Sequence, residues 1–126
     1  MPDATSVTVA EIQEIYLQIK GSRPGQIPSR DVMGYNAAAV ISCVKAVEQI
    51  TAANWEETVK ARAVALAFCL DHQSPFRDQN RLVALHVAMY FLIKNGFKIG
   101  GGALPRRGHF SQGNVLAWLN QISEAP

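Results

Sequence analysis

Residues 71–85, which read DHQSPFRDQNRLVAL, decide the fold because they interrupt an otherwise apolar part of the chain. The almost wholly apolar run ARAVALAFCL precedes them at residues 61–70, and the apolar run LVALHVAMYFLI follows at residues 82–93. A helix that is apolar on all sides is a buried one, so we expect these two runs to form the central helices. A polar turn held between two buried elements is a common place for reactive groups.

Capping residues and apolar periodicity predict helices through most of the remaining chain. Thr8, followed three residues later by Glu11, fits the capping box of a first helix. Side chains that can cap three further helices precede other apolar stripes, and these are Asn36, Asn54 and Ser111. On the second helix the spacing predicts an inner face made of Ala37, Val40, Ile41, Val44 and Val47.

Glycine and proline mark two loops, GSRPGQIPSRDVMGY at residues 21–35 and NGFKIGGGALPRRGHF at residues 95–110. No stretch alternates over a strand's length, although each loop has room for a short hairpin. The sequence therefore predicts an all-α fold over a single domain, residues 1–126. We expect a bundle of about five to six helices with a short flap or hairpin loop.

The composition is that of an ordinary globular protein, with 48% hydrophobic and 17% charged residues. A formal net charge of +2 gives no argument for nucleic acid or an anionic membrane as a partner. The N-terminus lacks the pattern of a signal peptide, and the longest apolar run is well short of the roughly 20 residues that span a bilayer. We therefore expect a cytoplasmic protein with no membrane and no nucleic acid among its partners.

The two cysteines, Cys43 and Cys69, each lie in an apolar helical run. An even pair can form a disulfide, but their spacing fits no disulfide framework. We therefore expect two buried free thiols in a reducing compartment.

The polar turn combines groups that suit an anion. Asp78, Gln79 or Asn80 can each cap the helix that follows, whose first turn has unpaired N–H groups and a positive dipole end. The guanidinium groups of Arg77 and Arg81 stand beside it, and phosphate is the common anion for such a site.

Two further side chains suit chemistry on that anion. The carboxylate of Asp78 can hold a Mg²⁺ ion shared with phosphate oxygens, and His72 can accept a proton near neutral pH. A structural interpretation is also open, in which Asp78 and Asn80 only cap a helix and His72 only ends one. On residue types alone the structural interpretation is the commoner one.

The turn resembles the signature of the Fic/Doc (death-on-curing) family, which is H-P-F-x-D-(G/A)-N-(K/G)-R, often followed by T-A-L. The residues that match without a gap are Pro75, Phe76, Asp78, Asn80, Ala84 and Leu85. The family's later N-G-(Y/F) falls on residues 95–97, and LAWL at residues 116–119 is similar to the last helix of the Doc branch. The resemblance covers roughly residues 8–122 and implies a Fic/Doc-like helical fold.

The resemblance also implies a function. Active members transfer AMP from ATP to a protein hydroxyl (AMPylation), and the Doc branch transfers a phosphate to a translation factor. The implied cofactors are Mg²⁺ and ATP, and the implied partners are a target protein and an antitoxin that restrains the toxin. In the family the His is the base, the small residue and backbone amides cradle phosphates, the acidic residue holds a metal and the Arg clamps the nucleotide.

Only part of this machinery transfers to the chain. The family's His falls on Ser74, whose hydroxyl has no useful pKa near 7, and its Arg falls on Leu82, which cannot bind phosphate. Its small Gly/Ala falls on Gln79, and its Lys/Gly falls on Arg81. Matching positions imply that Phe76 buries the loop, that Asp78 keeps a metal role and that Asn80 keeps its place in the anion hole.

Three hypotheses follow, and whether the protein is an enzyme stays open among them; the third is a plain interaction module that retains only the fold. The first is a Fic/Doc-like pseudoenzyme that binds a phosphate ligand, such as ATP, or a protein partner. Its phosphate-binding candidates are Arg77, Gln79, Asn80 and Arg81. The alternative is an active, toxin-like AMP- or phosphotransferase (a nucleotidyltransferase in the first case) that uses His72 as an unorthodox base.

Overall fold

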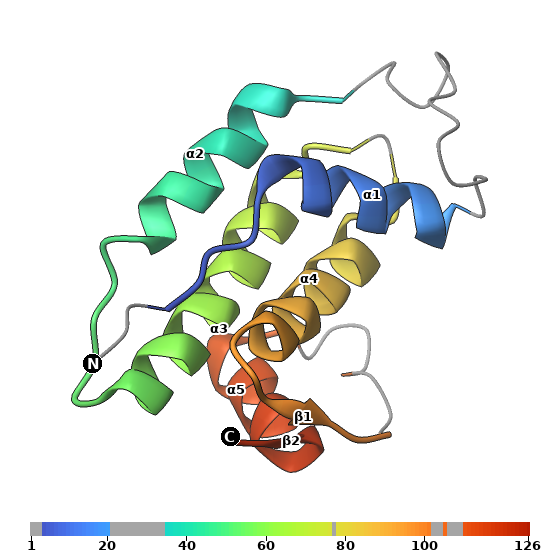
Figure 1. The fold of residues 1–126 in the computed structure, drawn as a ribbon. Coiled ribbons are helices and arrows are strands. Elements are labelled where there is room, and N and C mark those ends of the chain that lie inside the picture. The colour runs from blue at the N-terminus through green and yellow to red at the C-terminus, as the bar shows by residue number, and fades with distance from the viewer. Residues whose placement is uncertain (1–3, 21–34, 77, 102–104, 106–109) are drawn as a thin grey trace.

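The computed structural model describes residues 4–20, 35–76, 78–101, 105 and 110–126 (Figure 1). Over these residues the chain forms helices and two very short strands: α1 (Val9–Ile19), α2 (Ala37–Val47), α3 (Trp55–Gln73), α4 (Asn80–Lys94), β1 (Lys98–Ile99), α5 (Gln112–Ile122) and β2 (Ser123–Glu124). The predicted all-α class is confirmed. The predicted flap lies almost wholly in residues 21–34, outside the described residues.

The two apolar runs form the central helices, as predicted. Helix α3 packs against α2, α4 and α5, and α4 also contacts α1, which crosses the bundle in Figure 1. The buried residues of α4 are Val83, Ala84, Leu85, Val87, Ala88, Phe91 and Leu92. Those of α3 are Val59, Ala63, Val64, Leu66, Ala67 and Leu70. In the described part of the chain, no helix combines the length and the apolarity that a membrane span requires.

The predicted helix starts are confirmed because each depends on contacts within one turn. The Thr8 side chain accepts from the backbone N–H of Glu11, and the Glu11 carboxylate accepts from the backbone N–H of Thr8, which completes the capping box. The side chains of Asn36, Asn54 and Ser111 each accept from the backbone N–H three residues ahead.

The predicted inner face of α2 is only partly correct. Val40 and Val47 are buried, but Ile41 is 41% exposed, and the residue buried between them is Cys43. Residue 41 lies about 100° around the helix from residue 40, so a helix that packs on α3 through positions 40, 43 and 47 turns Ile41 to solvent. The second helix has more apolar residues than its contact face can bury.

A disulfide joins Cys43 of α2 to Cys69 of α3, with their Cα atoms 5.6 Å apart, so the prediction of two free thiols was wrong. The two residues are 26 positions apart in the sequence, and only the packing of α2 against α3 brings them together. That distance is a tertiary property, which the spacing of the cysteines does not reveal.

Both ends of the described chain are held near the end of α4. Strand β1 pairs antiparallel with β2, so the described start of the loop after α4 pairs with the C-terminal segment. The side chain of Asn95 accepts from the backbone N–H of Thr5 at 2.7 Å and donates to its carbonyl at 2.9 Å. Gly96 has a φ of +89°, a left-handed conformation that suits glycine at a helix end.

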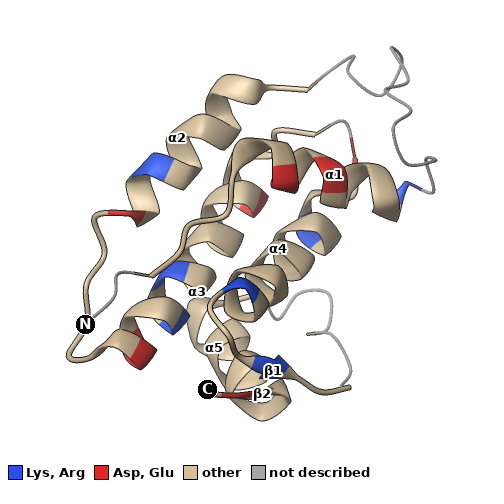
Figure 2. Ribbon diagram, in the orientation of Figure 1, with Lys and Arg blue, Asp and Glu red and all other residues tan. Residues whose placement is uncertain are grey.

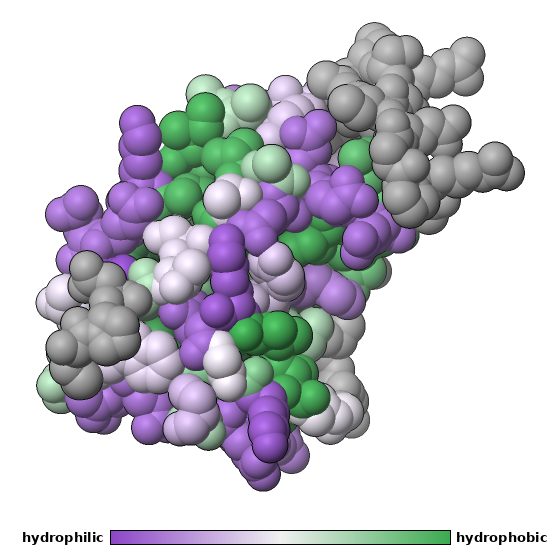
Figure 3. Space-filling model, in the orientation of Figure 1, coloured by the Kyte–Doolittle hydropathy of each residue, from purple (hydrophilic) through white to green (hydrophobic). Residues whose placement is uncertain are grey.

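Charge and apolar surface are dispersed in the orientation of the figures. Figure 2 shows acidic and basic residues of the described chain interspersed over the helices, consistent with the net charge of +2. Figure 3 shows that hydrophilic side chains divide the apolar surface of this face into separate areas.

Candidate functional site

The polar turn joins α3 to α4 through two left-handed residues. Ser74 ends α3 with φ 45°, and Gln79 precedes α4 with φ 60°. They are the only non-glycine residues with positive φ in the described part of the chain. Each costs on the order of 1–2 kcal/mol relative to the right-handed region. Such strain is characteristic of functional loops.

Phe76 anchors the turn in the core, as the resemblance implies. Its side chain is buried and stacks on Tyr16, with ring centroids 4.4 Å apart, and on Tyr35, with centroids 5.3 Å apart. Burial raises the pKa of the Tyr35 hydroxyl. Stacking between aromatic rings stabilises the folded state beyond the burial of their surface, so these three rings hold the turn against the core.

Asn80 braces the turn from inside. Its Oδ1 accepts from the backbone N–H of Phe76 at 2.9 Å, and its Nδ2 donates to the carbonyl of Phe76 at 3.1 Å. The side chain of Gln79, at the N-cap, makes no capping hydrogen bond. None of the predicted caps, Asp78, Gln79 and Asn80, therefore makes the usual N-cap hydrogen bond to α4. The backbone N–H groups of the first turn donate no hydrogen bond to the side chain of Gln79.

Asp78 pairs with groups from the end of α1. The Nζ of Lys20 lies 2.7 Å from its Oδ2, and the hydroxyl of Tyr16 lies 3.2 Å from its Oδ1. A Mg²⁺ ion at this carboxylate would have to displace the Lys20 ammonium. The described residues also contain no group of three or more His, Cys, Asp or Glu side chains that could hold a metal ion. The residues present do not fit a metal held by the protein alone.

Arg81 lies between an acid and an aromatic ring. Its Nε is 3.5 Å from Oδ1 of Asp71, which is an ion pair but too long for a good hydrogen bond, and its Cζ lies 5.0 Å above the ring of Phe110. Its side chain is 42% exposed. The guanidinium group therefore has donors left for a ligand.

A cleft of about 610 Å³ opens at the start of α4, and part of the predicted site lines it. Its walls are formed by Asp71, Gln79, Asn80, Arg81, Leu82, Leu85 and Pro105. The structure thus brings together three of the four phosphate-binding candidates, and the fourth, Arg77, lies outside the described residues. This cleft is smaller than another between α3 and α5 but is the one at the polar turn.

The two catalytic candidates do not line this cleft. His72 is exposed on the last turn of α3, and the exposed Ser74 donates its hydroxyl to the carbonyl of Asp71 at 3.1 Å. Sequence reasoning missed Lys20 as the partner of Asp78, because the two residues are 58 positions apart and nothing local links them. Asp71 was visible in the turn, but its pairing with Arg81 depends on how the turn folds.

No family model, curated protein or solved structure matches the chain. The case for its function therefore depends on the turn and its cleft.

Proposed function

We propose that the chain is a Fic/Doc-like domain whose polar turn binds a phosphate-bearing ligand, such as ATP, without transferring a group from it. The observation that carries this proposal is the open start of α4. The N-cap residue Gln79 makes no side-chain capping bond, and residues of the first turn line a cleft of about 610 Å³. Amides at a helix N-terminus, together with the helix dipole, favour an anion.

Arg81 supplies the charge for this site. Its guanidinium group lies on the wall of the cleft, with Phe110 beneath it and Asp71 beside it. The carboxylate of Asp71 offsets part of the positive charge, so we expect the affinity for phosphate to be modest. Mg²⁺ belongs to this proposal only as an ion that arrives with the nucleotide.

The lack of group transfer follows from the residues around the cleft. Ser74 stands where the family has its base, and its hydroxyl donates to the carbonyl of Asp71. Loss of a general base typically lowers the rate about 10²- to 10⁴-fold. Leu82 stands where the family has its phosphate-binding Arg, so electrostatic stabilisation of the transferred group is lost as well.

The alternative is an active AMP- or phosphotransferase in which His72 is the base. It requires the end of α3 to move, because His72 does not line the cleft. ATP labelled on the α- or γ-phosphate, incubated with the protein and a cell lysate, separates the two. Our proposal predicts no labelled product beyond those that the lysate forms without the protein. Label that disappears in His72→Ala would establish the alternative, and label that survives His72→Ala would contradict both.

A protein partner, which the family resemblance implies, and a cytoplasmic location, which the sequence predicts, also belong to the proposal. The implied partner is a translation factor or an antitoxin. The disulfide between Cys43 and Cys69 argues against a reducing compartment such as the cytoplasm, because disulfides persist mainly in oxidising compartments. Alkylation of free thiols in intact cells measures the state of the pair in its own compartment.

The decisive experiment is thermal unfolding with ATP, with and without Mg²⁺, and with inorganic phosphate. A ligand at 100 times its Kd stabilises the folded state by about 2.7 kcal/mol. We expect ATP to stabilise the wild-type protein and Arg81→Ala to bind about ten- to a hundredfold more weakly, since a charge-assisted hydrogen bond contributes about 1.5–3 kcal/mol. Lys45→Ala, which removes an exposed cation of α2, is the matched control and should bind as the wild type does. No stabilisation, or equal stabilisation of Arg81→Ala, would refute the site.

A further inference from the structure

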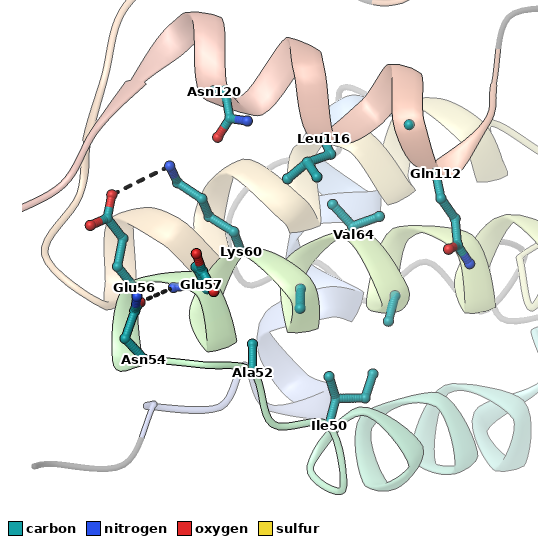
Figure 4. A pocket seen from close by; sticks show the side chains of 13 residues that line it. Ile50, Ala52, Asn54, Glu56, Glu57, Lys60, Val64, Gln112, Leu116 and Asn120 are labelled. Atoms are coloured by element: carbon teal, nitrogen blue, oxygen red, sulfur yellow. Dashed lines mark hydrogen bonds and ion pairs between the residues drawn. The ribbon is translucent and has the colours of Figure 1, made fainter.

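A second cleft, of about 880 Å³, lies between α3, α5 and the connection after α2 (Figure 4). Its end at Glu57 lies about 21 Å along α3 from Asp71, which lines the cleft at the polar turn, and its nearer end at Ala65 lies about 9 Å along α3 from Asp71. Its apolar lining is formed by Ile50, Ala52, Ala61, Val64, Ala65 and Leu116. The proposed phosphate site uses none of these residues.

The walls of this cleft are two rows of side chains at a spacing of four residues. On α3 the row is Glu57, Ala61 and Ala65, and on α5 it is Gln112, Leu116 and Asn120. Rows with this spacing are the ridges that interdigitate when helices pack, and the trough between two of them accepts the ridge of a third helix. The short side chains on α3 let another backbone approach closely.

The cleft has apolar side chains on its floor although it is open to solvent. Leu116 is 38% exposed and points toward Val64 across the trough in Figure 4. It is one of three large hydrophobic side chains that are exposed in the described part of the chain. An apolar floor with a polar rim is typical of a binding groove.

One end of the groove carries an acidic side chain that would attract a basic residue of a partner. Figure 4 shows Asn54, Glu56 and Glu57 together at the end where α3 begins. Glu56 pairs with Lys60 at 3.4 Å, whereas Glu57 has no ion pair within the residues that the structure describes. One carboxylate is thus in excess at this end, although the whole chain has a net charge of +2. A complementary partner carries a cation there.

We propose that the cleft between α3 and α5 is the docking site of a partner protein's amphipathic helix, with a basic residue beside Glu57 and an apolar stripe over Val64 and Leu116. Apolar side chains three and four residues apart on such a helix fill the trough between the ridges. This site is separate from the turn before α4, and the inference does not depend on the proposed phosphate binding.

The probe for this site is a synthetic peptide of about 15 residues, made of Leu and Lys with the leucines on one helical face. Fluorescence anisotropy of the labelled peptide gives its Kd. We expect it to bind more tightly than a scrambled peptide of the same composition and than the analogue in which Glu replaces every Lys.

Three variants locate the peptide. Leu116→Asp should weaken binding at least about tenfold, because it places a charge in the centre of the groove. Glu57→Gln should weaken it roughly two- to fivefold, as expected for one rim ion pair. Ile41→Asp, at a side chain of similar exposure on α2, is the matched control and should leave the Kd unchanged.

Circular dichroism establishes that each variant is folded before its affinity is compared. Equal binding of the designed and scrambled peptides would overturn the proposal, and so would equal loss in Leu116→Asp and Ile41→Asp. Sedimentation of the protein alone tests the other occupant. A dimer that Leu116→Asp dissociates would assign the groove to a second copy of this chain and overturn the proposal. Failure here leaves the ATP experiment unaffected, because no residue is shared.

Discussion

At the scale of single residues, the turn contains two residues whose backbone conformation is unfavourable. Ser74 and Gln79 adopt positive φ, and each stands where the Fic/Doc signature has another residue. At position 79 the family has a small Gly or Ala, and glycine is the residue that adopts this conformation at least cost. The strain at Gln79 therefore has a simple remedy that a substitution can test.

We predict that Gln79→Gly stabilises the protein by about 0.5–1 kcal/mol. Relief of the left-handed strain contributes about 1–2 kcal/mol, and the greater freedom of glycine in the unfolded chain takes back roughly 0.5–1 kcal/mol. Urea unfolding measures the difference. Gln79→Ala keeps a Cβ atom and so keeps the strain, and it should show no such gain. If the Gly variant is no more stable than the Ala variant, the conformation of residue 79 is not strained.

At the scale of elements, the disulfide fastens α2 to α3 and thereby supports the turn. Helix α2 begins just after Tyr35, whose ring packs on Phe76, and the backbone N–H of Asn36 donates to the carbonyl of Pro75 at 2.7 Å. The crosslink between Cys43 and Cys69 closes a segment of 26 residues. In the loop-entropy account, closing a loop of this length destabilises the unfolded state by about 3.5 kcal/mol.

We predict that the double variant Cys43→Ala, Cys69→Ala is less stable than the oxidised wild type by about 3.5 kcal/mol. Urea unfolding with and without dithiothreitol checks this. The reductant should lower the stability of the wild type toward that of the double variant and should leave the double variant unchanged. A wild type that is indifferent to the reductant would mean that the crosslink contributes nothing.

At the scale of the whole molecule, the N-terminal helix is held on the core by polar contacts with α4. The carboxylate of Glu11 accepts from Nζ of Lys94 at 2.5 Å and from the hydroxyl of Tyr90. Partial burial by itself would raise the pKa of Glu11, but the hydrogen bonds, first that from Lys94, outweigh it and lower the pKa from 4.5 to about 2. The hydrogen bond to Glu11, together with burial, raises the pKa of Tyr90.

We predict that Glu11 makes the protein sensitive to acid. Because its pKa is lower in the folded state, its contribution to stability is complete above pH 4.5 and is lost as the pH falls toward 2. Unfolding curves of the wild type and Glu11→Gln should therefore differ most near neutral pH and converge through this interval. Tyr90→Phe removes one hydrogen bond and should move the loss to higher pH. A constant difference between wild type and Glu11→Gln would exclude this linkage.

How far the site could be predicted varies from residue to residue. The burial of Phe76 was implied by the family resemblance, and its side chain is buried in the structure. Gln79, Asn80 and Arg81 were predicted to lie together because they are consecutive at one helix end. The partners of Asp78 could not be predicted, since they depend on how α1 crosses α4.

The sequence by itself determined what depends on neighbours within a turn or two: the helix starts, the apolar central helices, and the polar interruption between them. Only the tertiary structure decided the disulfide, the pairing of β1 with β2, the ammonium of Lys20 at Asp78, and the groove between α3 and α5. The physical reason is range. Caps and periodicity are local interactions, whereas these contacts join residues whose distance is set by helix packing across the whole chain.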